Sequence, residues 1–159
     1  MTDTRESITV ITPEQFLEDW QGHRRLTRRV IDAFPDETLF SHSLGGMRPF
    51  STLAMEMVKM AVPILRGVAS GEWTSYEPTE PTTKAELLAL WDQATADIDR
   101  LWPLVPPHRF QEVDTAFEQW TMPGYAMVLY AIDNEIHHRG QGYVYLRSLG
   151  ITPPQFYER

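Results

Sequence analysis

The stretch DNEIHHRGQGYVYLR, residues 133–147, decides the fold because it combines a helical pattern with unusual polarity. Apolar residues around it recur at three, four or seven positions, from Met127 through Ala131 to Leu149, and residues at that spacing share one face of a helix. That face is expected to be buried. Asn134 and His138 lie on it, so the segment predicts a helix that carries polar side chains into the core of a helical protein.

The composition is typical of one globular domain, taken as residues 1–159. The chain has 42% hydrophobic and 23% charged residues, and no apolar run approaches the roughly 20 residues that a bilayer span needs. No signal sequence is visible, so a cytoplasmic location is expected, with no membrane partner. Since cysteine is absent, the chain offers no thiolate ligand or nucleophile. The net charge of -8 argues against a nucleic-acid partner, and the basic segment HRRLTRR (23–29) is interpreted as a solvated helix face.

Four amphipathic helical segments are expected, at about residues 13–34, 49–68, 83–104 and 123–149. Thr12 followed by Pro13 is typical of a helix start, Thr83 begins the third segment, and Gly150 ends the fourth. Two of the connections between them are long, and residues 106–123 are interpreted as one of these, containing a short strand or a docked loop. The predicted fold is all-α, a four-helix bundle with long crossover connections.

Glu56 is the unusual residue of the second segment, because it lies among Leu53, Ala54, Met57 and Met60. A carboxylate on such an apolar face is costly unless a cation or a hydrogen-bond donor lies beside it. In a bundle, polar residues of facing helices meet between the helices, so Glu56 is expected to lie opposite the polar face of the last helix.

Asn134 and His138 are separated by one helical turn, which lets their side chains meet at one point, as two metal ligands on a helix do. The residues expected at the sides of that face are Glu135, His137 and Arg139. Two interpretations stay open on spacing alone. Either Glu56 and His138 bind a metal ion, or His138 is a hydrogen-bonded core residue and Glu56 pairs with Arg48 or Arg139.

The run NEIHHRGQGYVYLRSLGITPP closely resembles the last helix of the DinB/YfiT-like superfamily, and HRRLTRRVIDAFPDE and MRPFSTLAMEM resemble its first two helices. The resemblance implies a four-helix bundle with one long crossover, often dimeric. It also implies a divalent metal ion, usually nickel or zinc, held by three histidines, one from the second helix and a pair four residues apart on the fourth.

His138 matches the last of those ligands, whereas Asn134 and Glu56 stand where the family has histidines. The metal site implied by the resemblance is therefore Glu56, Asn134 and His138. Such an oxygen-rich set favours Mn, Fe or Mg over Ni, leaves Zn possible through Glu56 and His138, or weakens binding until the site is empty. His137 is interpreted as a residue behind the ligands or at the surface, because at normal helical pitch it is rotated by about 100° from His138.

Two functions follow from the resemblance. One is a metal-dependent enzyme linked to stress or damage response, a transferase acting on a small thiol or a hydrolase, with Tyr130, Gln141 or Tyr145 orienting the bound group. The other is a non-catalytic bundle with a metal-free polar core that binds a small ligand or a protein. No catalytic residue is readable from the sequence, and neither are the roles of Arg139 and His42.

A homodimer is expected from the resemblance and from the five Trp, six Tyr and seven Phe, more large aromatic residues than one small core requires. Gly140 and Gly142 lie inside a helix, where glycine is unfavourable, so they predict close approach of another segment.

Overall fold

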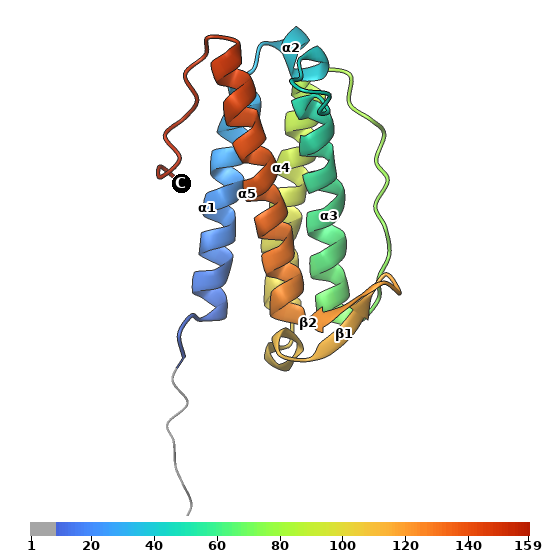
Figure 1. Ribbon diagram of the computed structural model, residues 1–159. Coiled ribbons are helices and arrows are strands. Elements are labelled where there is room, and N and C mark those ends of the chain that lie inside the picture. The colour runs from blue at the N-terminus through green and yellow to red at the C-terminus, as the bar shows by residue number, and fades with distance from the viewer. Residues whose placement is uncertain (1–8) are drawn as a thin grey trace, which may run out of the picture.

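A computed structural model describes residues 9–159. The extended start expected before the first helix lies almost entirely within residues 1–8, outside the described residues. The described residues form four long helices, one short helix, two short 3-10 helices and a hairpin, and the predicted all-α bundle is confirmed (Figure 1). The long helices are α1 (Pro13–Ala33), α3 (Phe50–Ser70), α4 (Lys84–Leu101) and α5 (Gly124–Ser148). No helix among the described residues is both long enough and apolar enough to cross a membrane.

The four long helices form a ring in which α3 lies against α4 and α5, and α1 lies against the same two helices. Residues 71–83 return along the outside of α3 from its end to the start of α4, so that α3 and α4 run in the same direction (Figure 1). This segment is the predicted crossover connection.

The starts of α1 and α4 follow the expected capping chemistry. Thr12 accepts a hydrogen bond from the Gln15 backbone, and Gln15 in turn accepts one from the Thr12 backbone. Thr83 and Glu86 form the same reciprocal arrangement at the start of α4. These caps satisfy backbone groups that the first helical turn leaves without partners. Pro63 lies within α3.

Two connections contain more structure than was expected. The segment before α3 includes a short helix, α2 (Asp36–Ser41). Residues 106–123 contain a short 3-10 helix, Pro107–Phe110, followed by an antiparallel hairpin of β1 (Val113–Ala116) and β2 (Trp120–Pro123). The turn between the strands places Phe117 and Glu118 at φ of 50° and 58°, in the left-handed region that non-glycine residues rarely adopt.

A layer of buried polar side chains lies between two apolar clusters of the bundle. Glu135 of α5 is 1% exposed and Arg24 of α1 is 0% exposed. The Nη1 atom of Arg24 is 3.6 Å from Oε2 of Glu135. Thr27 donates a hydrogen bond to Glu135 Oε1 over 2.6 Å. Arg139 lies on the other side of the carboxylate, with its Nη1 3.8 Å from Oε1. Much of the polarity of the last helix is therefore explained by this buried ionic layer, which α5 shares with α1.

This layer corrects two expectations. Arg24 does not lie on a solvated face, because it donates hydrogen bonds to the Trp91 carbonyl and to Thr95 and stacks 3.5 Å above the Trp91 ring. Glu135 and Arg139 do not lie at the sides of α5 but are buried against α1. The buried face of α5 is therefore rotated relative to the predicted one, since ion pairing makes these charged residues compatible with burial.

His23 lies at the edge of the same layer, with a guanidinium at each ring nitrogen. Arg139 Nη2 is 3.0 Å from Nδ1, and Arg159 Nη1 is 2.7 Å from Nε2. Burial lowers the pKa of His23, the two arginines lower it further, and Asp19 opposes them, so that the pKa is about 4. The ring is therefore neutral at pH 7.

The two helix-interior glycines have different environments. A Cβ on Gly142 would lie 2.5 Å from the Phe50 ring, so the close approach of α3 excludes a side chain there. At Gly140, a Cβ would meet nothing within 4 Å. The predicted close approach is therefore found at Gly142 and not at Gly140.

Candidate functional site

Glu56, Asn134 and His138 meet at one carboxylate oxygen between α3 and α5. Glu56 Oε1 accepts a hydrogen bond from Asn134 Nδ2 over 2.9 Å and is also 2.9 Å from His138 Nε2. Its other oxygen, Oε2, is 2.7 Å from Arg48 Nη1. The carboxylate of Glu56 therefore lies beside His138, as the metal-site interpretation expects. It also pairs with Arg48, as the metal-free interpretation expects.

The electrostatics of Glu56 follow from these contacts. Partial burial raises the pKa of Glu56, but hydrogen bonds from Asn134, His138 and Arg48 outweigh that effect and lower the pKa to about 2. The carboxylate is consequently ionised at neutral pH, as a metal ligand or the partner of a cation must be.

The ring of His138 also has a hydrogen-bond partner at the nitrogen that does not face Glu56. Its Nδ1 atom is 2.7 Å from Gln141 Oε1, and the Gln141 amide nitrogen lies 3.4 Å from the Met47 sulfur. Toward Glu56, which as a carboxylate only accepts, Nε2 is the donor. A metal ion bound at this place would take the position of the Nε2 proton, while the contact with Gln141 keeps the ring oriented. Asn134 Oδ1 is buried and has no hydrogen-bond partner among the described residues.

The remaining residues singled out in the sequence occupy separate places. His137 is exposed, and its ring lies edge-on to His138. His42 bonds to the Ser148 hydroxyl at 2.8 Å, away from Glu56. Tyr130 is 54% exposed, so it does not lie on the inner face of α5, although it borders the pocket described next. Tyr145 is buried and donates a hydrogen bond to the Arg48 carbonyl over 2.9 Å.

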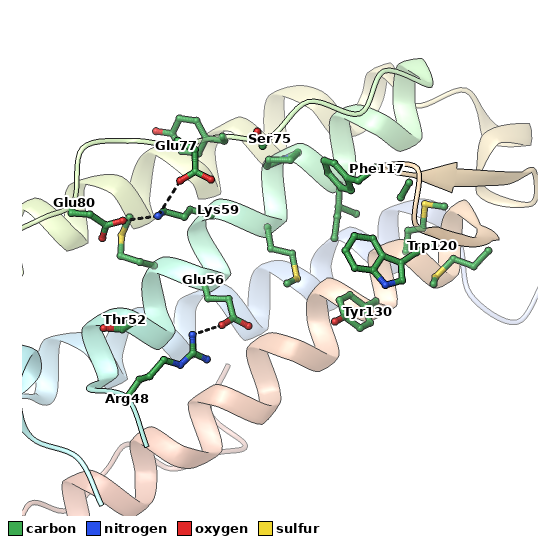
Figure 2. Close-up of a pocket in the computed structure, with 18 residues that line it drawn as sticks. Arg48, Thr52, Glu56, Lys59, Ser75, Glu77, Glu80, Phe117, Trp120 and Tyr130 are labelled. Carbon is green, nitrogen blue, oxygen red and sulfur yellow. Dashed lines mark hydrogen bonds and ion pairs between the residues drawn. The ribbon is translucent and has the colours of Figure 1, made fainter. Parts of the chain in front are cut away.

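A pocket of about 460 Å³ opens beside Glu56. Figure 2 shows Arg48 and Glu56 toward one end of it and Phe117 and Trp120 of the hairpin toward the other. Residues of the crossover segment cover one side, where Lys59 of α3 pairs with two of its glutamates. The wall is mainly apolar, so the polar cluster lies at the end of a space suited to a small molecule.

Several of these pocket residues could not be found from the sequence. Phe117 and Trp120 lie in the segment for which the sequence predicts a connection with a short strand or a docked loop, and their approach to α3 depends on the hairpin. Arg48 was recognised as one of two possible partners of Glu56. The one sequence signal for this part of the pocket is the aromatic-rich connection before the last helix, since exposed aromatic residues often mark binding surfaces.

The fold and the cluster define a helical bundle with a polar site between two helices, next to a pocket. The chain belongs to the DinB family, whose model matches residues 1–159. It is 26% identical over 151 residues to YrdA, an uncharacterised protein of Bacillus subtilis, with 92% of this chain and 88% of YrdA covered.

Two solved structures show the same fold. The DinB-like protein YjoA of Bacillus subtilis superposes with a TM-score of 0.77 at 18% identity, covering 91% of this chain and 99% of YjoA. A mycothiol-dependent maleylpyruvate isomerase superposes with a TM-score of 0.63 at 16% identity, covering 83% of this chain and 61% of the isomerase. At these identities the similarity establishes the fold and not the activity.

Proposed function

We propose that the protein is a metal-dependent enzyme that acts on a small molecule bound in the pocket beside Glu56. The observation that carries the proposal is the convergence of Glu56, Asn134 and His138 at the end of that pocket. The reaction class that fits is transfer of a small thiol or hydrolysis, in a cytoplasmic stress or damage response. Similarity to a mycothiol-dependent isomerase supports the thiol, which the substrate would have to supply because the chain has no cysteine.

The three residues fit a divalent cation. Glu56 Oε1 and His138 Nε2 are 2.9 Å apart. A carboxylate oxygen and an imidazole nitrogen are common ligands of divalent transition metals, and these two face each other. Asn134 offers its partnerless Oδ1 after the amide turns, and Gln141 already orients the imidazole. Arg48 occupies only the second oxygen of Glu56. The set of one nitrogen and two oxygens suits Mn, Fe or Zn better than Ni.

A divalent ion bound there would act as a Lewis acid that lowers the pKa of a coordinated thiol or water. The protein's own residues prepare the site for it. Gln141 orients the ring of His138, and Arg48 holds one oxygen of Glu56 so that the other faces the cluster. Buried Met55 and Met127 line the pocket and exclude water from its wall, which strengthens polar interactions at its end.

A second candidate is a metal-free binding protein. It is favoured by a specific observation, because Glu56 already receives hydrogen bonds or ionic contacts from Arg48, Asn134 and His138. A carboxylate with these partners is stable without a metal ion. In this case the pocket still binds a small molecule, and the polar cluster only closes one end of the pocket without taking part in a reaction.

Metal binding separates the two candidates. The chain is purified without nickel affinity or chelator, its metal content is measured, and Mn, Zn and Ni are titrated by calorimetry. Stoichiometric binding that Glu56→Gln and His138→Gln abolish, and that the exposed neighbour variant His137→Gln keeps, supports the enzyme. An unaltered chain that binds none of the three ions contradicts it and leaves the metal-free candidate.

Asn134→His gives an independent check on the metal site, since it restores the three-histidine pattern at one position. A nitrogen ligand favours Zn and Ni, so this variant is expected to bind them at least tenfold more tightly. Unchanged Zn and Ni affinities would indicate that residue 134 does not contact the ion.

We also propose that the protein is a homodimer. Support comes from one exposed stripe of α5 that contains Tyr125, Leu129, Ile136 and Val144, each at least 39% exposed. Their spacing places them on one face of the helix, and adjacent exposed apolar residues often form interfaces. Sedimentation at micromolar concentration should give twice the mass of one chain, and Leu129→Glu should give one chain. A monomer in the unaltered protein would contradict this proposal.

A further inference from the structure

The pocket is long rather than round. Its lining residues on α3 extend from Thr52 to Ile64, and at 1.5 Å per residue this part of the helix is about 18 Å long. Arg48 and Glu56 lie toward one end, whereas Phe117 and Trp120 lie toward the other (Figure 2). A compact polar metabolite would leave much of this length unfilled, so the shape favours an elongated ligand.

The wall of the pocket suits an apolar ligand body. It carries four methionines and four aromatic residues, namely Met55, Met60, Met122, Met127, Tyr76, Phe117, Trp120 and Tyr130. Methionine side chains are flexible and polarizable and adapt to apolar ligands of varied shape. Charged lining residues are confined to the Arg48–Glu56 end and to the contact between Lys59 and the crossover segment.

The two cations that line the pocket differ in how they are compensated. Lys59 Nζ is shared by Glu77 and Glu80, so its charge is more than balanced. The guanidinium of Arg48 has Glu56 as its one ionic partner among the described residues, and it is 51% exposed. Because only one of its terminal nitrogens makes that contact, Arg48 keeps donors for an anion.

The surroundings of Arg48 fit this role. Tyr145 donates a hydrogen bond to the Arg48 carbonyl, which ties the residue to α5. The negative charge of Glu56 is shared with Asn134 and His138 as well as with Arg48, which reduces its repulsion of an anion at this end. An anionic group can therefore bind Arg48 while the rest of the ligand extends toward Trp120.

We propose that the pocket binds an elongated apolar molecule with a single anionic head group, such as an alkyl carboxylic acid, and that Arg48 holds the head group. This inference rests on the proposed function, since it assigns a ligand class to the same pocket. It holds for either candidate, because neither the apolar wall nor Arg48 depends on a metal ion.

The test is displacement of the fluorescent apolar probe N-phenyl-1-naphthylamine from the full chain, in EDTA so that no metal ion contributes. Decanoate, 1-decanol and decylamine share one alkyl chain and differ in head-group charge. Decanoate is expected to displace the probe at a concentration at least tenfold lower than decanol or decylamine. Arg48→Gln should remove this preference, and Arg28→Gln should keep it, because Arg28 is comparably exposed but pairs with Asp92 on another face.

A pocket-filling variant, Met60→Trp, should weaken binding of the probe and of decanoate without changing the circular dichroism spectrum. Equal displacement by decanol, stronger displacement by decylamine, or an unchanged preference in Arg48→Gln would overturn the head-group assignment while the pocket as a binding site stands. Failure of the probe to bind would contradict the pocket as a site for apolar molecules and with it this inference, whereas the metal-dependent function is judged by the metal content. Metal content, measured separately, is unaffected by any of these outcomes.

Discussion

Replacing Glu135 by Gln tests whether the buried ionic layer is held by one carboxylate. The substitution keeps the volume of the side chain and removes its charge. Arg24 and Arg139 would then remain buried with no compensating anion from α5, since their contacts to Glu135 are 3.6 Å and 3.8 Å. Burial raises the pKa of the Glu135 carboxyl, and the two arginines and the Thr27 hydroxyl act in the opposite direction.

The expected loss of stability is large. Removing one partner of a buried ion pair costs about 3–5 kcal/mol, because an uncompensated charge stays in the interior. For a chain of this length, 1 kcal/mol corresponds to roughly 2–4 °C in Tm, so Glu135→Gln should lower Tm by about 6–20 °C. Thermal and urea unfolding followed by circular dichroism measure both quantities.

Asp92→Asn is the matched control, because it breaks the exposed pair of Asp92 with Arg28, which also joins α1 to α4. Exposed pairs contribute about 0–1 kcal/mol, so Tm should fall by less than about 4 °C. If Glu135→Gln is no more destabilising than this control, the guanidiniums do not depend on Glu135 and the reasoning about the layer is refuted.

Three further predictions concern stability. Gly142→Ala should destabilise the folded protein by about 1–3 kcal/mol, because the new methyl group meets the Phe50 ring. Gly140→Ala has open space around it and should stabilise the folded protein by up to about 1 kcal/mol. Equal effects of the two variants in urea unfolding would contradict the contact with Phe50. Because the pKa of His23 is about 4 when folded and about 6.5 when unfolded, the unfolded state binds more protons between these values. Stability should therefore fall as pH drops from 6.5 to about 4, and His23→Gln should reduce that slope in urea titrations; an equal slope would refute the assignment. Glu118→Gly should stabilise by about 1 kcal/mol by relieving the left-handed conformation, and a loss of Tm would show that the Glu118 side chain matters more than its backbone.

The helices could be predicted because their signals are local. Thr12 and Thr83 stand at helix starts with a Gln and a Glu three residues later, and hydrophobic periodicity marks the faces that pack. The meeting of Glu56, Asn134 and His138 also followed from local patterns, since a polar residue on an apolar face of each helix had to find a partner.

The hairpin could not be predicted in the same way. Its turn contains Phe117 and Glu118 rather than the Gly or Asn that such backbone angles favour, so no turn signal is visible. Contacts with Trp73 and Trp120 accompany this turn, with the ring of Phe117 5.5 Å and 6.3 Å from theirs. The sequence therefore did not show the end of the pocket that Phe117 and Trp120 form.

By itself, the sequence determined the class of fold, the helix starts, and the presence of polar residues on the inner faces of two helices, because these features depend on residues within a few turns of one another. Only the tertiary structure decided that Arg24 is buried, that Arg48 shares Glu56 with His138, and that a long apolar pocket ends there. The physical reason is compensation. A charged side chain is compatible with the interior only when a partner from a distant segment neutralises it, and the sequence does not show which segments will lie together.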